Sequence, residues 1–177
     1  MAQTKWNLDP THSEIGFKVR HMMMTNVSGE IEKFDLVATT EGDDFSTAVV
    51  EFTADMATIN TRNADRDAHL KGADFFDVEK HPKLVFKSTG IEKKDDENFI
   101  VKGDLTIRDV TKPVSLNVEF GGIGKDPWGN TKAGFTVSGK IVRSEFGLNW
   151  NAALETGGVL VSDEVRLSGE VQLVRGA

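Results

Sequence analysis

The feature that most constrains this sequence is an alternation of apolar and polar residues that recurs along most of its length. Ile15, Phe17 and Val19, for example, alternate with the charged residues Lys18 and Arg20. A period of two residues is typical of β-strands that bury one face. Runs of this kind occupy residues 15–19, 27–40, 48–55, 84–92, 99–108, 114–120, 135–141 and 165–173. The alternation therefore predicts about eight strands.

The segments between these runs favour an antiparallel arrangement. Residues 41–44, 93–98 and 126–130 are short and rich in Gly, Asp and Asn, so each can join neighbouring antiparallel strands. No helix alternates regularly with the strands, and no linker or low-complexity tract divides the chain. The sequence therefore predicts an all-β fold, an antiparallel barrel or sandwich, in a single domain over residues 1–177.

One short helical segment is expected near residues 63–76. Asn63 is a favourable N-cap, and Asp65 and Asp67 suit the positively polarised first turn of a helix. The pair Lys71-Gly72 is a favourable stop. The acidic residues also form an Asp65-x-Asp67-x-His69 run, but side chains two positions apart on a helix diverge. We therefore interpret this run as a solvated face and expect no metal site there.

Four of the predicted strands carry a glycine at a position whose neighbours two residues away are apolar and inward-facing. These glycines are Gly29, Gly103, Gly139 and Gly169. Inward glycines let a sheet coil tightly and leave part of its interior empty, and an eight-stranded barrel is just wide enough to hold one small ligand. The alternative is that the glycines only relieve crowding in a filled core. The sequence alone leaves both interpretations open.

Two polar residues continue the inward-facing rows of their strands. His21 follows Ile15, Phe17 and Val19 at this parity, and Arg143 follows Ile141. Both stand at the ends of their rows, so we expect them near one rim of a barrel. A guanidinium that faces an apolar space needs a partner, because its desolvation costs several kcal/mol.

Several partners for Arg143 are compatible with the sequence. One is the head group of a ligand, such as a diphosphate or a carbonyl. Others are the neighbouring acids Glu145, Glu155 and Asp163. A third alternative is a bulge that returns Arg143 to water.

Composition excludes several classes of function. The 177 residues contain no cysteine, which excludes disulfides, thiolate zinc sites and a cysteine nucleophile. The net charge is −7, from 21 Lys+Arg and 28 Asp+Glu, so a general nucleic-acid surface is not expected. No nucleophile elbow or phosphate loop is present, and we expect no cofactor.

No apolar run has the length of a membrane span, and residues 1–9 do not resemble a signal peptide. We therefore predict a cytoplasmic protein, or a periplasmic one if a leader has been removed.

Two apolar features lie outside the predicted strands. Phe75 and Phe76 end the helical segment, and residues 144–162 form a long connection that contains Phe146 and Leu148. Connections of this length are uncommon unless they are functional or cover something. We expect the helix and this connection to form a base and a lid at the mouth of a barrel.

Several blocks of the sequence form a pattern that covers most of the chain. They lie within residues 6–21, 59–88, 103–114, 143–148 and 157–165 and include Gly103-Asp104-Leu105-Thr106-Ile107 and Arg143-Ser144-Glu145-Phe146-Gly147-Leu148. In these blocks the sequence resembles the YceI-like family of lipocalin-like, polyisoprenoid-binding bacterial proteins. The resemblance implies an eight-stranded antiparallel up-and-down barrel, extended relative to lipocalins, with an elongated apolar interior. It also implies an isoprenoid, isoprenoid quinone or other long-chain lipid as ligand, and a homodimer. The chain departs from the family pattern at Asp109 and Ser162, where Gly is common.

These observations lead to one main hypothesis and two alternatives. The main hypothesis is a non-catalytic carrier that holds a long amphiphilic lipid inside the barrel. One alternative is a small-barrel isomerase or hydrolase, with His21 as general base and Arg143 as an anion clamp on a prenyl substrate. The other is a filled barrel that serves as a dimeric interaction module. The residues expected to contact a lipid are Ile15, Phe17, Val19, His21, Phe75, Phe76, Val101, Leu105, Val118, Phe135, Val137, Ile141, Arg143, Phe146 and Leu148.

Overall fold

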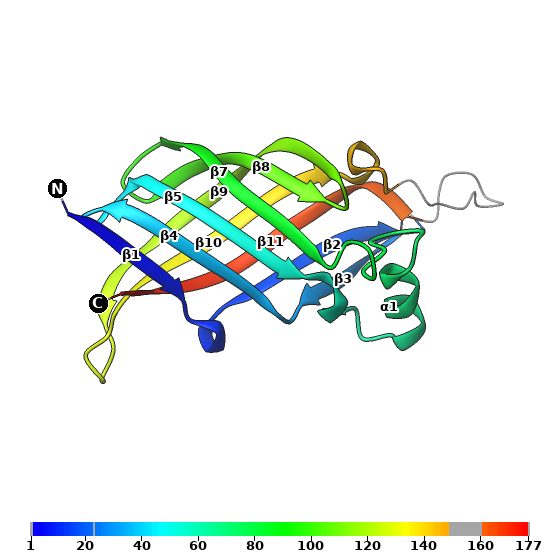
Figure 1. The fold of residues 1–177 in the computed structure, drawn as a ribbon, viewed down its shortest axis with the longest axis horizontal. Coiled ribbons are helices and arrows are strands. Elements are labelled where there is room, and N and C mark those ends of the chain that lie inside the picture. Colours follow the sequence, from blue (N-terminus) through cyan, green and yellow to red (C-terminus); the bar gives the residue numbers. More distant parts are fainter. Residues whose placement is uncertain (1, 23, 149–160, 177) are drawn as a thin grey trace.

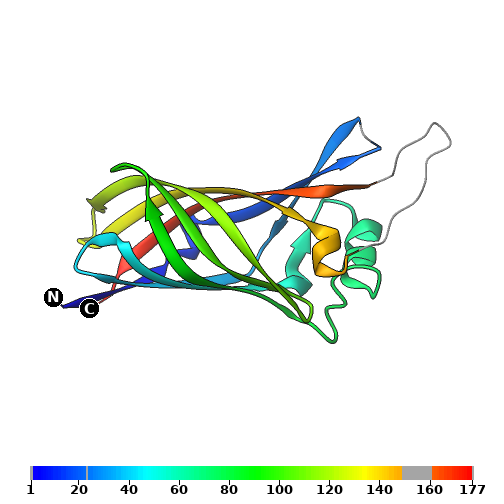
Figure 2. The ribbon, with the colours of Figure 1, turned by 90° about the horizontal axis from the view of Figure 1, so that it is seen from above.

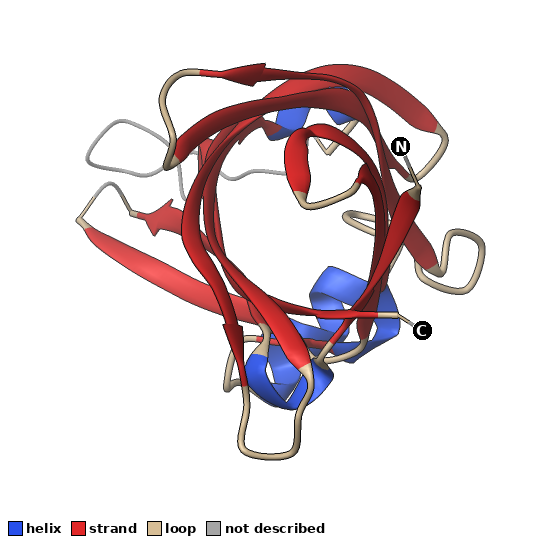
Figure 3. Cartoon of the chain, turned by 90° about the vertical axis from the view of Figure 1, so that its left-hand side faces the viewer, coloured by secondary structure: helices blue, strands red, loops and turns tan. Residues whose placement is uncertain are grey.

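Eight antiparallel strands form a closed barrel in the computed structural model, which describes residues 2–22, 24–148 and 161–176 (Figures 1 and 3). In order around the ring they are β1 (Gln3–Leu8), β4 (Phe34–Glu41), β5 (Asp44–Asp55), β7 (Lys83–Lys93), β8 (Asn98–Ile107), β9 (Val110–Lys125), β10 (Thr131–Val142) and β11 (Val161–Arg175). Pairing of β1 with β11 closes the ring. The expected eight-stranded antiparallel barrel is confirmed.

Three further strands lengthen the wall on one side. They are β2 (Glu14–His21), β3 (Thr25–Ile31) and β6 (Ile59–Asn60). Strand β11 is shared, because Leu173–Arg175 pairs with β1 whereas Val161–Glu170 pairs with β2. Strand β3 then pairs with β2, and β6 with β3. As a result β2 and β3 project beyond the ring at the end that carries the helix (Figure 2).

The alternation merged two strands into one and missed a third. The single strand expected over residues 27–40 is wrong, because the chain turns at Glu32-Lys33 and forms β3 and β4 with different partners. Strand β1 was not predicted, since only Trp6 and Leu8 are apolar in its six residues. Its identity as a strand depends on pairing with β4 and β11, which lie far away in sequence.

The helix α1 (Ala64–Lys71) begins as the sequence indicates. The Asn63 side chain caps it by accepting a hydrogen bond of 3.0 Å from the Arg66 backbone N–H. Gly72 ends it, so the predicted stop is confirmed, but the expected extension to Phe76 is wrong. Phe76 instead lies in the turn after the helix, where its N–H donates to the Leu70 carbonyl. The helix lies at the end of the barrel opposite the two chain termini (Figure 1).

Each of the four inward glycines lies beside a large side chain of a neighbouring strand. The pairs are Gly29 with Phe17, Gly103 with Phe86, Gly139 with Leu116 and Gly169 with Ile15. A β-carbon at any of these glycines would collide with that side chain. The glycines therefore let large apolar side chains lie flat along the wall.

Substitution of one of these glycines is expected to be costly. At Gly103, a β-carbon would lie 2.5 Å from the Lys87 carbonyl oxygen and 2.5 Å from the Phe86 ring. We expect Gly103→Ala to lower the free energy of unfolding by about 1–3 kcal/mol, since a backbone oxygen cannot easily move away. Gly90 on β7 is the matched control, because a β-carbon there would meet nothing within 4 Å. Urea denaturation of both variants checks this, and equal stability of the two would contradict it.

A network of charges fixes the start of the chain to the β9–β10 hairpin. The Asp9 carboxylate accepts hydrogen bonds from Lys132 Nζ at 2.6 Å and from the Thr11 N–H at 3.1 Å, and it lies 2.8 Å from His12 Nδ1. Lys132 Nζ also lies 3.7 Å from Asp126 Oδ2. The hydrogen bond from Lys132 holds the pKa of Asp9 well below its ordinary value, and the neighbouring carboxylates raise the pKa of Lys132.

This network makes part of the stability dependent on pH. A carboxyl group whose pKa is lower in the folded state stabilises the fold above its unfolded pKa, and this stabilisation is lost as the pH falls below that value. We expect Asp9→Asn to lower the free energy of unfolding at pH 7 by about 1.5–3 kcal/mol, because it removes a charged hydrogen bond. The difference from the unmodified protein should shrink as the pH falls below about 4. Urea denaturation between pH 7 and 3 tests this, and a constant difference would contradict it.

Candidate functional site

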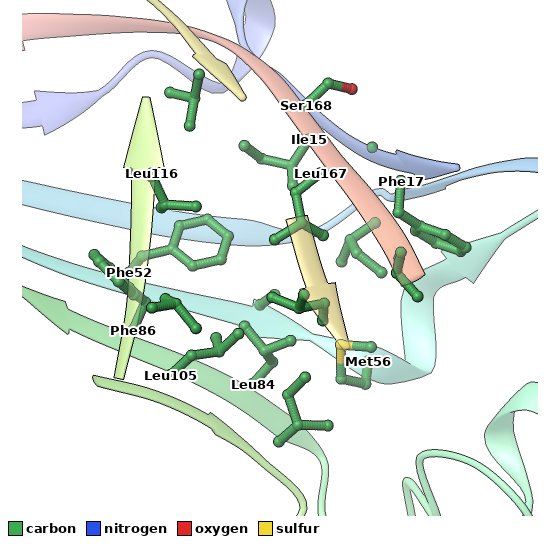
Figure 4. A pocket seen from close by; sticks show the side chains of 18 of the residues that line it. Ile15, Phe17, Phe52, Met56, Leu84, Phe86, Leu105, Leu116, Leu167 and Ser168 are labelled. Carbon is green, nitrogen blue, oxygen red and sulfur yellow. The ribbon is translucent and has the colours of Figure 1, made fainter. Parts of the chain in front are cut away.

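The interior of the barrel is hollow. A cavity of about 590 Å³ runs along it, lined almost entirely by apolar side chains from the barrel strands and from β2 and β3. Figure 4 shows that Phe52, Phe86, Leu105, Leu116 and Ile15, which come from five different strands, point into the same space. Of the two interpretations that the sequence left open, the structure thus supports the hollow barrel rather than the filled one.

The structure brings together all but one of the residues expected at the site. Those on the cavity wall are Ile15, Phe17, Val19, His21, Phe75, Phe76, Val101, Leu105, Val118, Phe135, Val137, Ile141, Arg143 and Leu148. Phe146 is different, because it is 1% exposed and packs in the core behind the wall. It belongs to the short 3₁₀ helix η3 (Arg143–Phe146) and packs in a cluster that includes Phe86, Leu105 and Ile141.

Several wall residues on β4, β5 and β7 are not among the predicted lipid contacts. They include Leu36, Val50, Phe52, Leu84 and Phe86. The signal for them was present, because all of them belong to runs in which alternate residues are apolar. Most of the connection over residues 144–162, which is expected to form a lid, lies outside the described residues, including its apolar residues Trp150, Leu154, Val159 and Leu160.

One end of the cavity is closed by an aromatic plug, made of Trp6, Phe45, Phe120 and Phe135. The ring of Phe45 lies 5.0 Å from Trp6, 5.3 Å from Phe120 and 4.9 Å from Phe135, measured between ring centres. Trp6 is fully buried, and its indole N–H donates a 3.0 Å hydrogen bond to the Thr40 hydroxyl. Only Phe45 and Phe135 face the cavity, so Trp6 and Phe120 form a second layer behind them.

The opposite end of the cavity is polar. Among the described residues, the polar side chains of the wall other than Ser168 come from the end of β2, the β6–α1 connection, α1 and the start of η3. They are Arg20, His21, Thr61, Asp65, Arg66, His69 and Arg143. These elements all lie at the helix end of the barrel (Figure 1). The cavity therefore has an apolar, closed end and a polar, helical end.

Arg143 is buried, with 5% of its surface exposed, and backbone carbonyl oxygens surround its guanidinium. Nε donates to Ser162 at 2.9 Å, Nη1 to Leu148 at 2.6 Å and Nη2 to Val161 at 3.3 Å. Burial lowers the pKa of Arg143, and the negative charge of Asp163 opposes this shift. Arg143 thus ties η3 and Leu148 to the start of β11.

These carbonyl partners differ from the partners that the sequence suggested for Arg143. The alternative in which a bulge returns Arg143 to water is wrong, because the side chain is buried. The Asp163 carboxylate contributes charge, but its oxygens accept hydrogen bonds from the Ser144 N–H at 2.9 Å and hydroxyl at 2.6 Å. Glu155 lies outside the described residues. Backbone carbonyls could not be predicted as the partners, because every residue has a backbone carbonyl.

The polar side chains of the helical end are held by local hydrogen bonds. Arg66 donates to the Thr61 hydroxyl at 2.8 Å and to the Thr61 carbonyl at 2.6 Å, and Asp67 accepts from the Thr61 N–H at 2.8 Å. His69 Nε2 lies 3.0 Å from an Asp74 carboxylate oxygen, and its ring contacts that of Phe75 edge-on. Asp67 and His69 therefore have separate partners, and among the described residues no His, Asp and Glu side chains gather in a metal-binding group.

Comparisons with known proteins agree with this architecture. The YceI-like domain family matches residues 6–173. A UPF0312 protein of Staphylococcus epidermidis is 39% identical over 170 residues, which cover 96% of each chain. Within the described residues, no helix has the length and apolar character needed to cross a membrane.

Solved structures share the fold. A YCEI protein of Campylobacter jejuni superposes with a TM-score of 0.78 and 33% identity, covering 96% of this chain and 97% of that one. A polyisoprenoid binding domain of Saccharophagus degradans superposes with a TM-score of 0.66 at 13% identity, covering 97% and 98%. The barrel and the matched length together show that the chain belongs to the YceI-like family.

Proposed function

We propose that this protein binds and carries a long amphiphilic lipid, such as a polyisoprenoid or an isoprenoid quinone, inside its barrel. The observation that carries the proposal is the cavity of about 590 Å³ with its apolar wall. A cavity with so few polar groups cannot satisfy the hydrogen bonds of a polar ligand over most of its length. The Saccharophagus degradans domain, which has the same fold, is a polyisoprenoid binding domain, and this supports a polyisoprenoid as the ligand.

The energetics of burial are sufficient for useful affinity. Each buried carbon contributes about 0.8 kcal/mol, so one five-carbon isoprene unit contributes about 4 kcal/mol before the chain loses its freedom. Micromolar binding requires about 8 kcal/mol. A ligand with a few isoprene units therefore reaches this range even after the cost of ordering the chain.

The distribution of polar groups supports one orientation of the lipid. We propose that the tail points to the aromatic plug and the head group stays at the helical end, near His21 and Arg66. Within the described part of the chain, the tail end offers only apolar contacts such as Phe45, Phe135 and Leu173. At the helical end, polar groups of a lipid find donors and acceptors on the wall, and the exposed Arg66 can face both head group and water.

We propose that the protein acts without catalysis. The enzymatic alternative needs Arg143 as an anion clamp, but the guanidinium already donates to the carbonyls of Leu148, Val161 and Ser162. His21 does line the cavity. If the protein turned over a prenyl substrate, His21→Ala would abolish turnover and leave binding intact. A homodimer and a cytoplasmic location stay predictions, which light scattering and cell fractionation would check.

Extraction of the purified protein tests the proposed function. The protein would be isolated without detergent, extracted with chloroform and methanol, and the extract analysed by mass spectrometry. We expect a long-chain lipid in an amount comparable to that of the protein. Because a bound lipid can be lost during purification, the extracted protein would also be incubated with a long-chain isoprenol and repurified. Absence of lipid from both samples would refute the proposal.

A further inference from the structure

We propose that Phe45 sets the maximum length of the lipid chain that the barrel accepts. This inference rests on the proposed function and adds a specificity determinant to it. A chain that enters with its tail toward the aromatic plug can advance only until it meets the plug. The side chain that forms the cavity side of the plug therefore limits the number of carbons that can be buried.

Phe45 holds the central position in the plug. It is the second residue of β5 and is 7% exposed, and its ring contacts those of Trp6, Phe120 and Phe135. Phe135 also faces the cavity, but its ring stacks on Phe120 at 5.3 Å, on the same side of the barrel. Phe45 alone bridges this pair and Trp6. Its removal would therefore open space between the two walls.

In the second layer behind Phe45, Trp6 has contacts that do not involve Phe45. Trp6 is fixed by its hydrogen bond to Thr40, and the Thr40 hydroxyl in turn donates 2.6 Å to the Gly42 carbonyl. The Arg175 guanidinium covers the Trp6 ring at 5.3 Å from its centre. Phe45→Ala is thus expected to deepen the cavity without opening the barrel to water at this end.

The size of the change is about one isoprene unit. An engineered apolar cavity of about 150 Å³, made by removing one large side chain, stays dry and accepts a benzene ring with its six carbons. Truncation of Phe45 creates space of the same order, which matches five carbons. We therefore expect the longest accepted chain to grow by about one unit.

The opposite change can be made three residues along the same strand. Ala48 lies on the cavity wall and is half-buried, so its side chain borders empty space. Ala48→Leu would fill part of the cavity near the plug. The accepted chain should then become shorter, by up to one unit.

Competition among chains of different length tests this inference. Delipidated protein would be incubated with an equimolar mixture of linear all-trans isoprenols of two to eleven units, repurified and extracted, and the retained lengths measured by mass spectrometry. We expect the unmodified protein to retain chains up to a limit and to lose longer ones. The limit should rise by about one unit in Phe45→Ala and fall in Ala48→Leu.

Phe146→Ala is the matched control, because Phe146 is also a buried phenylalanine but does not line the cavity and lies at the other end of the barrel. The longest isoprenol that this variant retains should be the same as for the unmodified protein. If Phe45→Ala does not fold, as judged by circular dichroism, Phe45→Leu and Ala48→Leu still test the direction of each shift. If the longest retained chain is unchanged in the folded variants, the role of Phe45 in limiting chain length is overturned, but lipid binding is not. Retention of no isoprenol by the unmodified protein overturns both.

Discussion

Replacing Arg143 with alanine is expected to lower the free energy of unfolding by about 3–5 kcal/mol, because the buried guanidinium donates charged hydrogen bonds that alanine cannot replace. The guanidinium donates to the carbonyls of Leu148, Val161 and Ser162, and 5% of the residue is exposed. Its loss leaves these oxygens without that donor in a buried site, which costs about 1–3 kcal/mol for each unsatisfied group. The connection between η3 and β11 should therefore loosen at the polar end of the cavity.

Two further variants separate geometry from charge. Arg143→Lys keeps the charge but loses the planar fork that reaches three oxygens at once, so it should recover only part of the stability. Arg166→Ala removes an exposed arginine from β11 and should change the stability by less than about 0.5 kcal/mol. Chemical denaturation measures all three. A fully stable Arg143→Ala variant that has lost lipid binding would contradict the structural role and favour a head-group contact instead.

Much of the cavity wall could be predicted because a strand alternates its faces. Once Phe17 and Val137 are assigned to the inside, the parity of the pleat places the other residues of β2 and β10, including His21 at the end of its row. The glycines at the same parity could also be recognised. Whether they emptied the barrel or relieved crowding could not be decided, because the answer depends on the neighbouring strands. In the structure, Gly103 accommodates the ring of Phe86, a residue seventeen positions away.

The aromatic plug could not be predicted from parity. Phe45 follows a turn, and its position differs by one from the inward row of Ala48, Val50 and Phe52. The register of β4 against β5 shifts between Thr39 and Glu41, which brings this odd-numbered residue to the inside. Trp6 is buried through pairing with strands that lie more than thirty residues away or at the other terminus. The alternation of apolar and polar residues in one sequence does not reveal a bulge or pairing between distant strands.

The polar end was predicted in part for a related reason. His21 and Arg143 could be placed by their strands, but Arg66 and His69 reach the cavity from a helix that lies at the end of the barrel. Their contribution depends on how α1 docks. The sequence predicted a helical segment near residues 63–76 at the mouth of the barrel, with a cap at Asn63 and a stop at Gly72, but it did not predict which helical side chains would reach the cavity. The hydrogen bonds of Arg66 to Thr61, which fix its guanidinium near the wall, arise from the turn before the helix.

A tryptophan in the middle of the wall is expected to weaken binding of a long lipid by at least about 100-fold. Val137 lies on β10 opposite Val118 of β9 and faces the cavity. Val137→Trp would occupy space that about one isoprene unit needs, and burial of one unit contributes about 4 kcal/mol, or up to three orders of magnitude in affinity. A chain short enough to fit beside the indole should lose much less, so the effect should grow with chain length.

The control for this variant is Val49→Trp, which makes the same chemical change on the outer face of β5, where Val49 is 61% exposed. It should leave affinity unchanged, because its neighbour Val50 still faces the cavity. Displacement of a fluorescent fatty-acid probe by a long isoprenol measures both variants, and circular dichroism confirms that each is folded. Equal affinities of a folded Val137→Trp variant and its control would mean that the lipid binds outside the barrel, because a ligand inside cannot share its space with an indole.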